Sequence, residues 1–209
     1  DDSKVPIILV GDSASMISYG YSTTLPIQME ELLLVTRAVS RAATNSFVVG
    51  DMPFLSYQTS TSSAIRNAGL LLKGGGVEAV KLEGGMSIAS RIKKIVSCGI
   101  PVMGHIGLTP QSVNQLSGNK IQGKSLGSAQ KILDDARSLE DAGVFSVVLE
   151  CIPQELSKLI TSTLSIPTIG IGAGKFCDGQ VQVFHDILGL LKTFHPKHAK
   201  KYTNLYKII

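Results

Sequence analysis

Seven short apolar runs recur along the chain, each rich in β-branched residues and nearly continuous in hydrophobicity. They span residues 7–10, 47–50, 79–82, 101–103, 146–149, 168–171 and 181–184. Hydrophobicity without a polar residue at every second position is typical of parallel strands that are buried on both faces. The pattern therefore predicts seven strands of one parallel sheet.

Between these runs lie segments whose apolar residues recur at the spacing of an amphipathic helix. They span residues 27–43, 62–72, 88–98, 128–142 and 154–164. Gly99 and Gly143 follow two of them, where a helix commonly ends in a left-handed residue. Alternating strands and helices indicate βαβ units. A closed barrel has eight strands, so the pattern fits a barrel whose first strand is absent from this chain, or an open doubly wound sheet.

The composition indicates a single globular domain over residues 1–209. The chain is 44% hydrophobic and 17% charged, which suits one sizeable core. The net charge is +4, but no dense basic stripe with interleaved aromatic residues appears, so no nucleic-acid partner is expected. No apolar run reaches the roughly 18–20 residues that a membrane span needs.

The cysteines indicate the compartment. Cys98, Cys151 and Cys177 are an odd number and lack the spacing of a disulfide framework or a zinc site. A reducing compartment, and hence a cytoplasmic location, is expected. No signal peptide is visible at the start. Because the chain opens close to its first strand, N-terminal material such as an organellar targeting segment could precede it.

Polar or charged side chains close nearly every apolar run. They are Asp12, Asp51, Lys81, Glu83, His105 and Glu150, and the last run closes on His185 and Asp186. Functional groups of a parallel barrel gather at the carboxyl ends of its strands. Random placement of the 16 acidic residues would rarely give this pattern, so the set indicates an active site.

Three of these acids predict a metal site. Asp12, Asp51 and Glu83 follow three consecutive runs, and adjacent strands lie about 4.8 Å apart. Oxygen ligands suit Mg²⁺, which takes one or two direct carboxylates, whereas zinc prefers histidine and cysteine. Taken singly, Asp12 could instead cap a helix, Asp51 could form a turn and Glu83 could lie on the surface.

A lysine and a second glutamate predict substrate binding and proton transfer. Lys81 and Glu83 are two residues apart on one strand, so both face the barrel mouth. Lys81 suits the carboxylate of an anionic substrate, or it pairs with a neighbouring glutamate. Glu150 closes a fully apolar run, where desolvation should raise the pKa of its carboxyl and make it a useful general base. The alternative for Glu150 is a buried ion pair with lysine or arginine.

Two further residues carry weaker signals. Ser13 could donate a hydrogen bond to an oxyanion or cap a helix. His105 could be a general acid, an orienting group or a structural histidine. The GIGAG segment at residues 170–174 lacks the spacing of a dinucleotide fingerprint and is interpreted as a tight strand-to-helix turn.

Short motifs occur in a characteristic order from about Val5 to Tyr202. They are VGDS with TLPI, DMPF, VKLEGG, GHIGLTPQS, KIQGK, VLECIP, IGIGAG and DGQV. Together they resemble the successive motifs of the ketopantoate hydroxymethyltransferase family. The resemblance implies a (β/α)8 TIM barrel, here without its first strand.

The resemblance also implies a reaction. The family transfers a hydroxymethyl group from 5,10-methylenetetrahydrofolate to α-ketoisovalerate, giving ketopantoate and tetrahydrofolate on the route to pantothenate and coenzyme A. It uses Mg²⁺, and its members are homo-oligomers, commonly decamers.

Motif by motif, the resemblance assigns roles to residues of this chain. Asp12 and Asp51 look like metal ligands, Glu83 like a further acid at the metal, and Glu150 like the catalytic base with His105 as a second catalytic residue in the same pocket. The ketoacid-binding residues look like Asp12, Ser13, Asp51 and Lys81. The chain departs from the family at Ser22-Thr23, where Asp-Ser is common, and at Lys124, where arginine is common. Both departures bear on folate binding and oligomer contacts rather than on the metal.

Two other readings compete. A Mg²⁺-dependent carbon–carbon lyase or mutase of the phosphoenolpyruvate-mutase or isocitrate-lyase type would share the barrel and the oxo-acid chemistry. Those enzymes carry a reactive cysteine before Gly-His, where this chain has Met103. The second is a barrel that binds an oxo-acid without turnover, and the intact set of acids argues against it.

Overall fold

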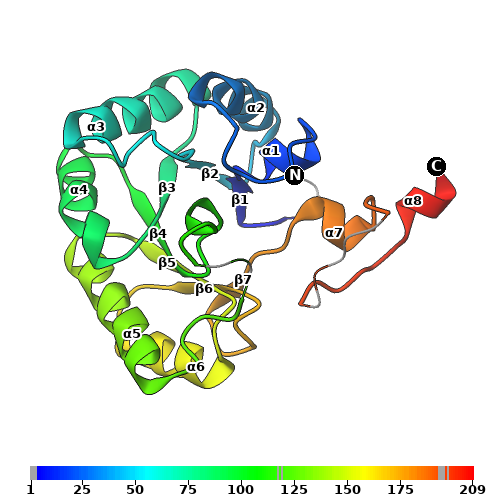
Figure 1. Cartoon of the computed structure of the whole chain (residues 1–209). Helices are drawn as coiled ribbons and strands as arrows, with labels where there is room; N and C mark the ends of the chain where they lie inside the picture. The colour runs from blue at the N-terminus through cyan, green and yellow to red at the C-terminus, as the bar shows by residue number, and fades with distance from the viewer. Residues whose placement is uncertain (1–3, 117, 119, 193–195, 197) are drawn as a thin grey trace.

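The computed structural model describes residues 4–116, 118, 120–192, 196 and 198–209. Its strands form one parallel, curled sheet with helices around its outer side (Figure 1). The strands are β1 (Ile7–Val10), β2 (Phe47–Asp51), β3 (Ala79–Glu83), β4 (Val102–Gly107), β5 (Ser146–Glu150), β6 (Thr168–Ile171) and β7 (Gly179–Gln180).

The strand order decides between the two predicted architectures. The strands pair in sequence order from β1 to β7, and every pair is parallel. A doubly wound sheet would reverse its order at a switch point, so that alternative is wrong. Within the described residues the ladder stays open between β1 and β7, and the fold is an incomplete barrel of seven strands, as predicted.

The helices follow the predicted alternation. They are α1 (Ala14–Ile17), α2 (Met29–Ala42), α3 (Thr61–Leu70), α4 (Met86–Ser97), α5 (Leu126–Asp141), α6 (Gln154–Thr163), α7 (Phe184–Leu188) and α8 (Leu205–Ile208). A π-helical turn (Leu71–Gly75) extends α3, and a 3₁₀ turn (Pro110–Ser112) follows β4. None of the described helices is both long and apolar enough to cross a membrane.

Local sequence explains where several helices begin and end. At the start of α2, Gln28 N donates to Glu31 Oε2 at 2.8 Å in a capping box. At the start of α3, the Ser60 hydroxyl accepts a hydrogen bond from the next turn. Gly99 (φ 82°) and Gly143 (φ 90°) adopt the predicted left-handed conformation.

The sheet separates two hydrophobic layers. The larger packs the helices against the outer face and includes Val48. The smaller lies on the inner face and consists of Val49, Ala79, Met103 and Val148, with partly buried neighbours. Val48 and Val49 belong to different layers because successive side chains of a strand point to opposite faces.

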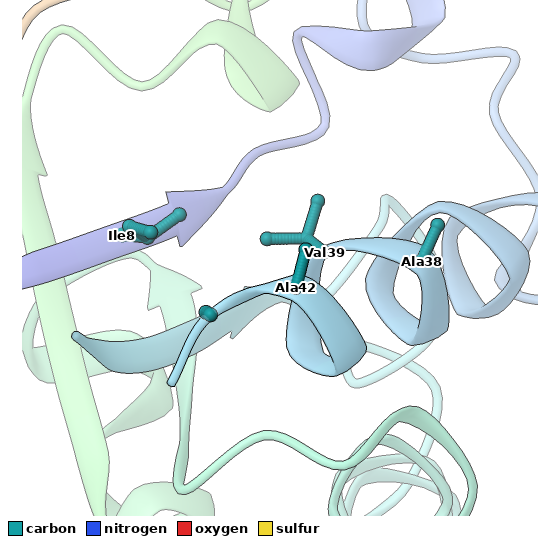
Figure 2. Close-up of a pocket in the computed structure, with 5 residues that line it drawn as sticks. Ile8, Ala38, Val39 and Ala42 are labelled. Carbon is teal, nitrogen blue, oxygen red and sulfur yellow. The ribbon is translucent and has the colours of Figure 1, made fainter. Parts of the chain in front are cut away.

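An apolar hollow of about 340 Å³ lies between β1 and α2 (Figure 2). Ile8 lines it from the strand, and Ala38, Val39 and Ala42 line it from the helix. It offers no polar side chain to an anionic substrate, so it is not the candidate active site.

The predicted strand at residues 181–184 is wrong. The seventh strand is Gly179–Gln180, paired with Ile169 and Gly170 of β6. Phe184 begins α7, so His185 and Asp186 lie on a helix rather than at a strand end. The apolar residues that alternate at 181–184 imitate a strand although the chain has already left the sheet.

The polar, glycine-rich segment after β4 ends at Leu126, where α5 begins. Ser117 and Asn119 of this segment lie outside the described residues. Cys98, Cys151 and Cys177 are all free, as the predicted lack of a disulfide framework requires.

Candidate active site

The inner face of the sheet brings the predicted site residues together. Asp51 lies two residues beyond Val49 on β2, so it continues the same inward row. Lys81 and Glu83 likewise follow Ala79 on β3, His105 follows Met103 on β4, and Glu150 follows Val148 on β5. The inner face of the sheet is therefore apolar along the middle of the strands and charged at their carboxyl ends.

Lys81 is the centre of this cluster. Asp51 is its partner in the β2–β3 register, and Lys81 Nζ lies 2.9 Å from Asp51 Oδ1 and 3.8 Å from Glu83 Oε1. The Lys81 side chain is 4% exposed. Burial lowers the pKa of Lys81, but the surrounding carboxylates outweigh it and the net pKa is raised. Lys81 is thus a buried ammonium, and its nearest carboxylate is Asp51 rather than the glutamate that the sequence suggested.

Asp12 joins the cluster from the turn after β1. Its backbone N–H donates to Asp51 Oδ2 at 3.1 Å. Burial, together with the nearby Asp51 and Glu83 charges, raises the pKa of Asp12 well above its ordinary value. Burial also raises the pKa of Asp51, against the opposing charge of Lys81. Ser13 rather than Asp12 is at the N-cap position of α1, and Asp51 ends strand β2. The alternative roles of Asp12 as a helix cap and of Asp51 as a turn former are therefore wrong.

His105 connects the cluster to Glu150. Its Nε2 lies 3.1 Å from Glu150 Oε2, and its Nδ1 lies 3.5 Å from Glu83 Oε1 and 3.2 Å from Lys81 Nζ. Burial and the Lys81 charge lower the pKa of His105, but the two glutamates outweigh them and raise it to about 9. The two glutamates therefore favour the charged imidazolium form of His105 over the neutral ring.

Glu150 differs from its predicted surroundings. It pairs with His105 rather than with lysine or arginine, and 16% of its side chain is exposed. The carboxylate is thus not enclosed in a wholly apolar setting. The next residue, Cys151, has a left-handed φ of 48°, which is costly for a side chain with a Cβ. Its amide is fixed by donation to Ile171 O at 2.8 Å.

Two residues that the sequence reasoning missed link the acids. Gln111 donates from Nε2 to Asp12 Oδ2 and from its backbone N to Glu83 Oε2, both at 2.9 Å. The Tyr57 hydroxyl donates to Gln111 Oε1 at 2.8 Å. Both residues are buried. The only sequence signal for Gln111 was its place inside the GHIGLTPQS motif.

Ser13 occupies the N-cap position of α1, as its alternative role predicts, but its side chain makes no capping hydrogen bond. The contact of its hydroxyl with substrate stays a prediction.

The sequence of this chain is similar to a known protein family and to named relatives. The family model described as ketopantoate hydroxymethyltransferase matches residues 1–209. The chain belongs to this family. A 3-methyl-2-oxobutanoate hydroxymethyltransferase of Dehalococcoides mccartyi is 56% identical over 209 residues, covering 100% of this chain and 74% of the relative. One of Clostridium botulinum is 56% identical over 205 residues, covering 98% and 74%.

Solved structures with low identity support the fold alone. A protein of Burkholderia cenocepacia described as a phosphonomutase has a TM-score of 0.66 at 12% identity, covering 86% of this chain and 78% of its own. Orotidine 5'-monophosphate decarboxylase of Methanocaldococcus jannaschii has a TM-score of 0.58 at 14% identity, covering 99% and 87%. The incomplete barrel of this chain thus resembles these two structures in fold, and their chemistry does not follow from that.

The carboxylate oxygens of Asp12 and Asp51 suit a metal ion that takes two protein carboxylates as ligands. No group of three or more His, Cys, Asp or Glu side chains in the described ranges is arranged to hold an ion. Glu83 is engaged by Gln111 N on one oxygen and by His105 and Lys81 on the other. Asp51 is also engaged on both oxygens, by Lys81 and by Asp12 N. Burial, together with the charges of Asp51 and Glu83, raises the pKa of Asp12, and a cation beside Asp12 and Asp51 would stabilise their charged forms. Mg²⁺ commonly takes only one or two carboxylates and keeps its waters.

The His105 contacts predict a pH-dependent stability. Its pKa is about 9 in the folded chain against 6.5 ordinarily, so its stabilisation is complete below about pH 6.5 and is lost as the pH rises through about 9. At about 1.4 kcal/mol per pKa unit, the upper limit is about 3 kcal/mol. We expect the free energy of unfolding to fall between pH 7 and 9.5, measured by urea denaturation. The slope should flatten in His105→Asn but not in the exposed control His198→Asn; equal slopes in all three would contradict this account.

Proposed function

We propose that this chain catalyses hydroxymethyl transfer to α-ketoisovalerate (3-methyl-2-oxobutanoate), as its curated relatives are named for doing. One observation carries the proposal. A continuous series of contacts runs from Asp12 through Asp51, Lys81 and His105 to Glu150 at the carboxyl end of the inner sheet face. The ammonium of Lys81, the carboxylates of Asp12 and Asp51 and the carboxylate of Glu150 therefore lie in one cluster, and this supports the proposal that they act together on one anionic substrate.

The ketoacid would be held by Lys81 and the two aspartates. The buried ammonium of Lys81 would pair with the substrate carboxylate, and Ser13 would add a hydroxyl donor from the neighbouring turn. Asp12 and Asp51 would hold Mg²⁺, with Glu83 acting on it through water. Bound Mg²⁺ would supply Lewis-acid stabilisation of the negative charge that develops on the keto oxygen.

Glu150 would then act as the general base. It takes the proton from C3 of the ketoacid, and His105 orients the carboxylate through Nε2. C3 next forms a bond to the methylene carbon of 5,10-methylenetetrahydrofolate, and water supplies the hydroxyl on that carbon as its two carbon–nitrogen bonds to the folate break. The proton from C3 and the remaining proton of the water end on the two folate nitrogens. With one water consumed, the products are ketopantoate and tetrahydrofolate, so the enzyme would serve pantothenate synthesis.

The direct test supplies all partners at once. The chain is incubated with α-ketoisovalerate, MgCl₂ and 5,10-methylenetetrahydrofolate, and ketopantoate is detected by mass spectrometry. We expect product only when all three are present. Binding of the ketoacid without product or C3 proton exchange would favour the non-catalytic barrel, and cleavage of a carbon–carbon bond would favour a lyase.

Asp51→Asn should weaken Mg²⁺-dependent ketoacid binding. The substitution keeps the volume and the acceptor for Asp12 N but removes a buried charge. We expect a Kd for α-ketoisovalerate at least tenfold higher in the presence of Mg²⁺, about 1.4 kcal/mol, measured by calorimetry. The exposed Asp141→Asn serves as the control. An unchanged Kd in Asp51→Asn would remove Asp51 from the site.

We also propose, from family membership, that the chain acts as a homo-oligomer, with a decamer as the expected form, in the cytoplasm. Analytical ultracentrifugation measures the first property.

A further inference from the structure

Gln111 connects two of the acids, although it carries no charge. It lies in the 3₁₀ turn Pro110–Ser112 that follows β4. Proline at the first position of that turn presets the backbone torsion, and Ser112 N closes the turn by donating to Thr109 O at 2.8 Å. The turn thereby returns Gln111 to the end of the sheet, where the residue is buried beside Asp12.

The contacts of the Gln111 side chain fix the orientation of its amide. Nε2 lies 2.9 Å from the backbone carbonyl oxygen of Met52. A carbonyl oxygen can only accept a hydrogen bond, so the amide atom that faces it is the nitrogen. The second N–H of the same group donates to Asp12 Oδ2 at 2.9 Å. Both amide protons are therefore used, and a rotated amide would place oxygen against oxygen at both contacts.

Tyr57 holds the other end of this amide. Its hydroxyl accepts from the backbone N–H of Glu83 at 3.1 Å and lies 2.8 Å from Gln111 Oε1. The hydroxyl has one proton to donate, and Gln111 Oε1 is nearer than the Glu83 carbonyl oxygen, which lies at 3.0 Å. Tyr57 is itself buried in the hydrophobic core. Buried partners thus hold the Gln111 amide at both ends.

The hydrogen bonds of Gln111 decide which acid oxygen is open to a ligand. Both oxygens of Asp51 are engaged, one by Lys81 Nζ and the other by Asp12 N. Both oxygens of Glu83 are engaged as well, one by Gln111 N and the other by Lys81 Nζ. Gln111 Nε2 occupies Asp12 Oδ2. In the part of the chain that the structure describes, no hydrogen bond or ion pair reaches the remaining oxygen, Asp12 Oδ1.

We infer that Gln111 is a positioning residue that presents Asp12 Oδ1 to a divalent cation. Its side chain holds Asp12 Oδ2 and so fixes the plane of that carboxylate, while its backbone N–H holds Glu83 back from direct ligation. Tyr57 acts through Gln111 by fixing the amide. The inference rests on the proposed function, in which Asp12 and Asp51 hold Mg²⁺, and it names the residue that orders this site.

The expected effect on cation binding is large. A carboxylate whose torsions are already fixed loses less conformational entropy when the ion binds than a carboxylate that is free to rotate. Removing a residue that holds a metal ligand in place typically lowers metal affinity by about 10–100-fold. The role of Gln111 is therefore measurable with the metal alone, in the absence of ketoacid and folate.

Gln111→Met tests the inference. Methionine keeps the length of the side chain and the backbone N–H that Glu83 accepts, but it removes the amide. We expect the Kd for Mg²⁺, measured by calorimetry on the folded chain with MgCl₂ alone, to rise by about 10–100-fold. Thr36→Val is the control for the loss of a buried hydrogen bond elsewhere, since it removes the 2.7 Å contact to Leu32 O within α2. It should leave the Kd for Mg²⁺ unchanged.

Tyr57→Phe keeps the inference testable if Gln111→Met does not fold. It removes only the hydroxyl that lies 2.8 Å from Gln111 Oε1. The Kd for Mg²⁺ should rise by about threefold to tenfold, as expected for the loss of one neutral hydrogen bond. The double variant should bind Mg²⁺ no more weakly than Gln111→Met alone, because Tyr57 acts on the cation only through Gln111. Losses that add in the double variant would overturn the role of Tyr57.

The outcomes separate this inference from the proposed function. A wild-type Kd for Mg²⁺ in folded Gln111→Met and Tyr57→Phe would overturn the inference, and so would an equal loss of affinity in Thr36→Val. Formation of ketopantoate by the wild-type chain would show that the proposed function stands in either case. A wild-type chain that binds no Mg²⁺ would instead overturn the proposed metal site together with the role of Gln111.

Discussion

Replacing Glu150 with glutamine is expected to lower the rate of C3 proton exchange from α-ketoisovalerate by about 10²–10⁴-fold, the usual contribution of a positioned general base. Glutamine has nearly the same shape and keeps an oxygen at the position that lies 3.1 Å from His105 Nε2. It cannot take a proton from carbon. The Kd for the ketoacid should therefore change little while exchange, followed by NMR in D₂O, is lost.

The matched control is Glu155→Gln. Glu155 lies exposed in the first turn of α6, away from the inner sheet face, and its replacement should leave the exchange rate unaltered. Exchange that persists in Glu150→Gln near the wild-type rate would show that another group is the base.

Lys81→Met is expected to destabilise the chain by about 3–5 kcal/mol, the usual cost of breaking a buried ion pair by removing one partner. Methionine fills much of the same space, so the loss is mainly electrostatic. Lys81 Nζ lies 2.9 Å from Asp51 Oδ1, and without it the buried Asp51 and Glu83 charges face each other uncompensated. Urea denaturation at pH 7 measures the difference, and ketoacid binding should be lost together with the ammonium.

The pH dependence separates this electrostatic cause from a packing defect. Burial raises the pKa of both Asp12 and Asp51, so lowering the pH neutralises them readily and should reduce the penalty of Lys81→Met. The exposed control Lys93→Met should change stability by less than about 0.5 kcal/mol. A Lys81→Met penalty that is equal at pH 5 and pH 7 would point to lost packing instead.

Much of the fold could be predicted because parallel strands leave a strong hydrophobic signal. Six of the seven runs begin within one residue of the first residue of a strand, and the charged residues of the site were found because a charge closes a mostly apolar run. The seventh strand was misplaced because Gly179–Gln180 forms only a two-residue ladder. Its apolar content is too small to compete with the more hydrophobic residues that follow it.

The candidate site could be predicted only in part. The contact between Asp51 and Lys81 follows from the strand period of two. Asp51 lies two residues after Val49 and Lys81 two residues after Ala79, so both side chains point to the inner face of the sheet. Gln111 comes from a 3₁₀ turn after β4, and no periodicity indicates that its amide reaches back to Asp12. No sequence pattern indicates either that the backbone N–H of Gln111 donates a hydrogen bond to Glu83.

The most direct test of the central claim uses the wild-type chain without any folate. α-Ketoisovalerate is incubated in D₂O with the protein, with and without Mg²⁺, and the C3 proton signal is followed by NMR. The account predicts that the signal disappears at a catalysed rate only when protein and Mg²⁺ are both present. Binding of the ketoacid with no exchange at any Mg²⁺ concentration would contradict it.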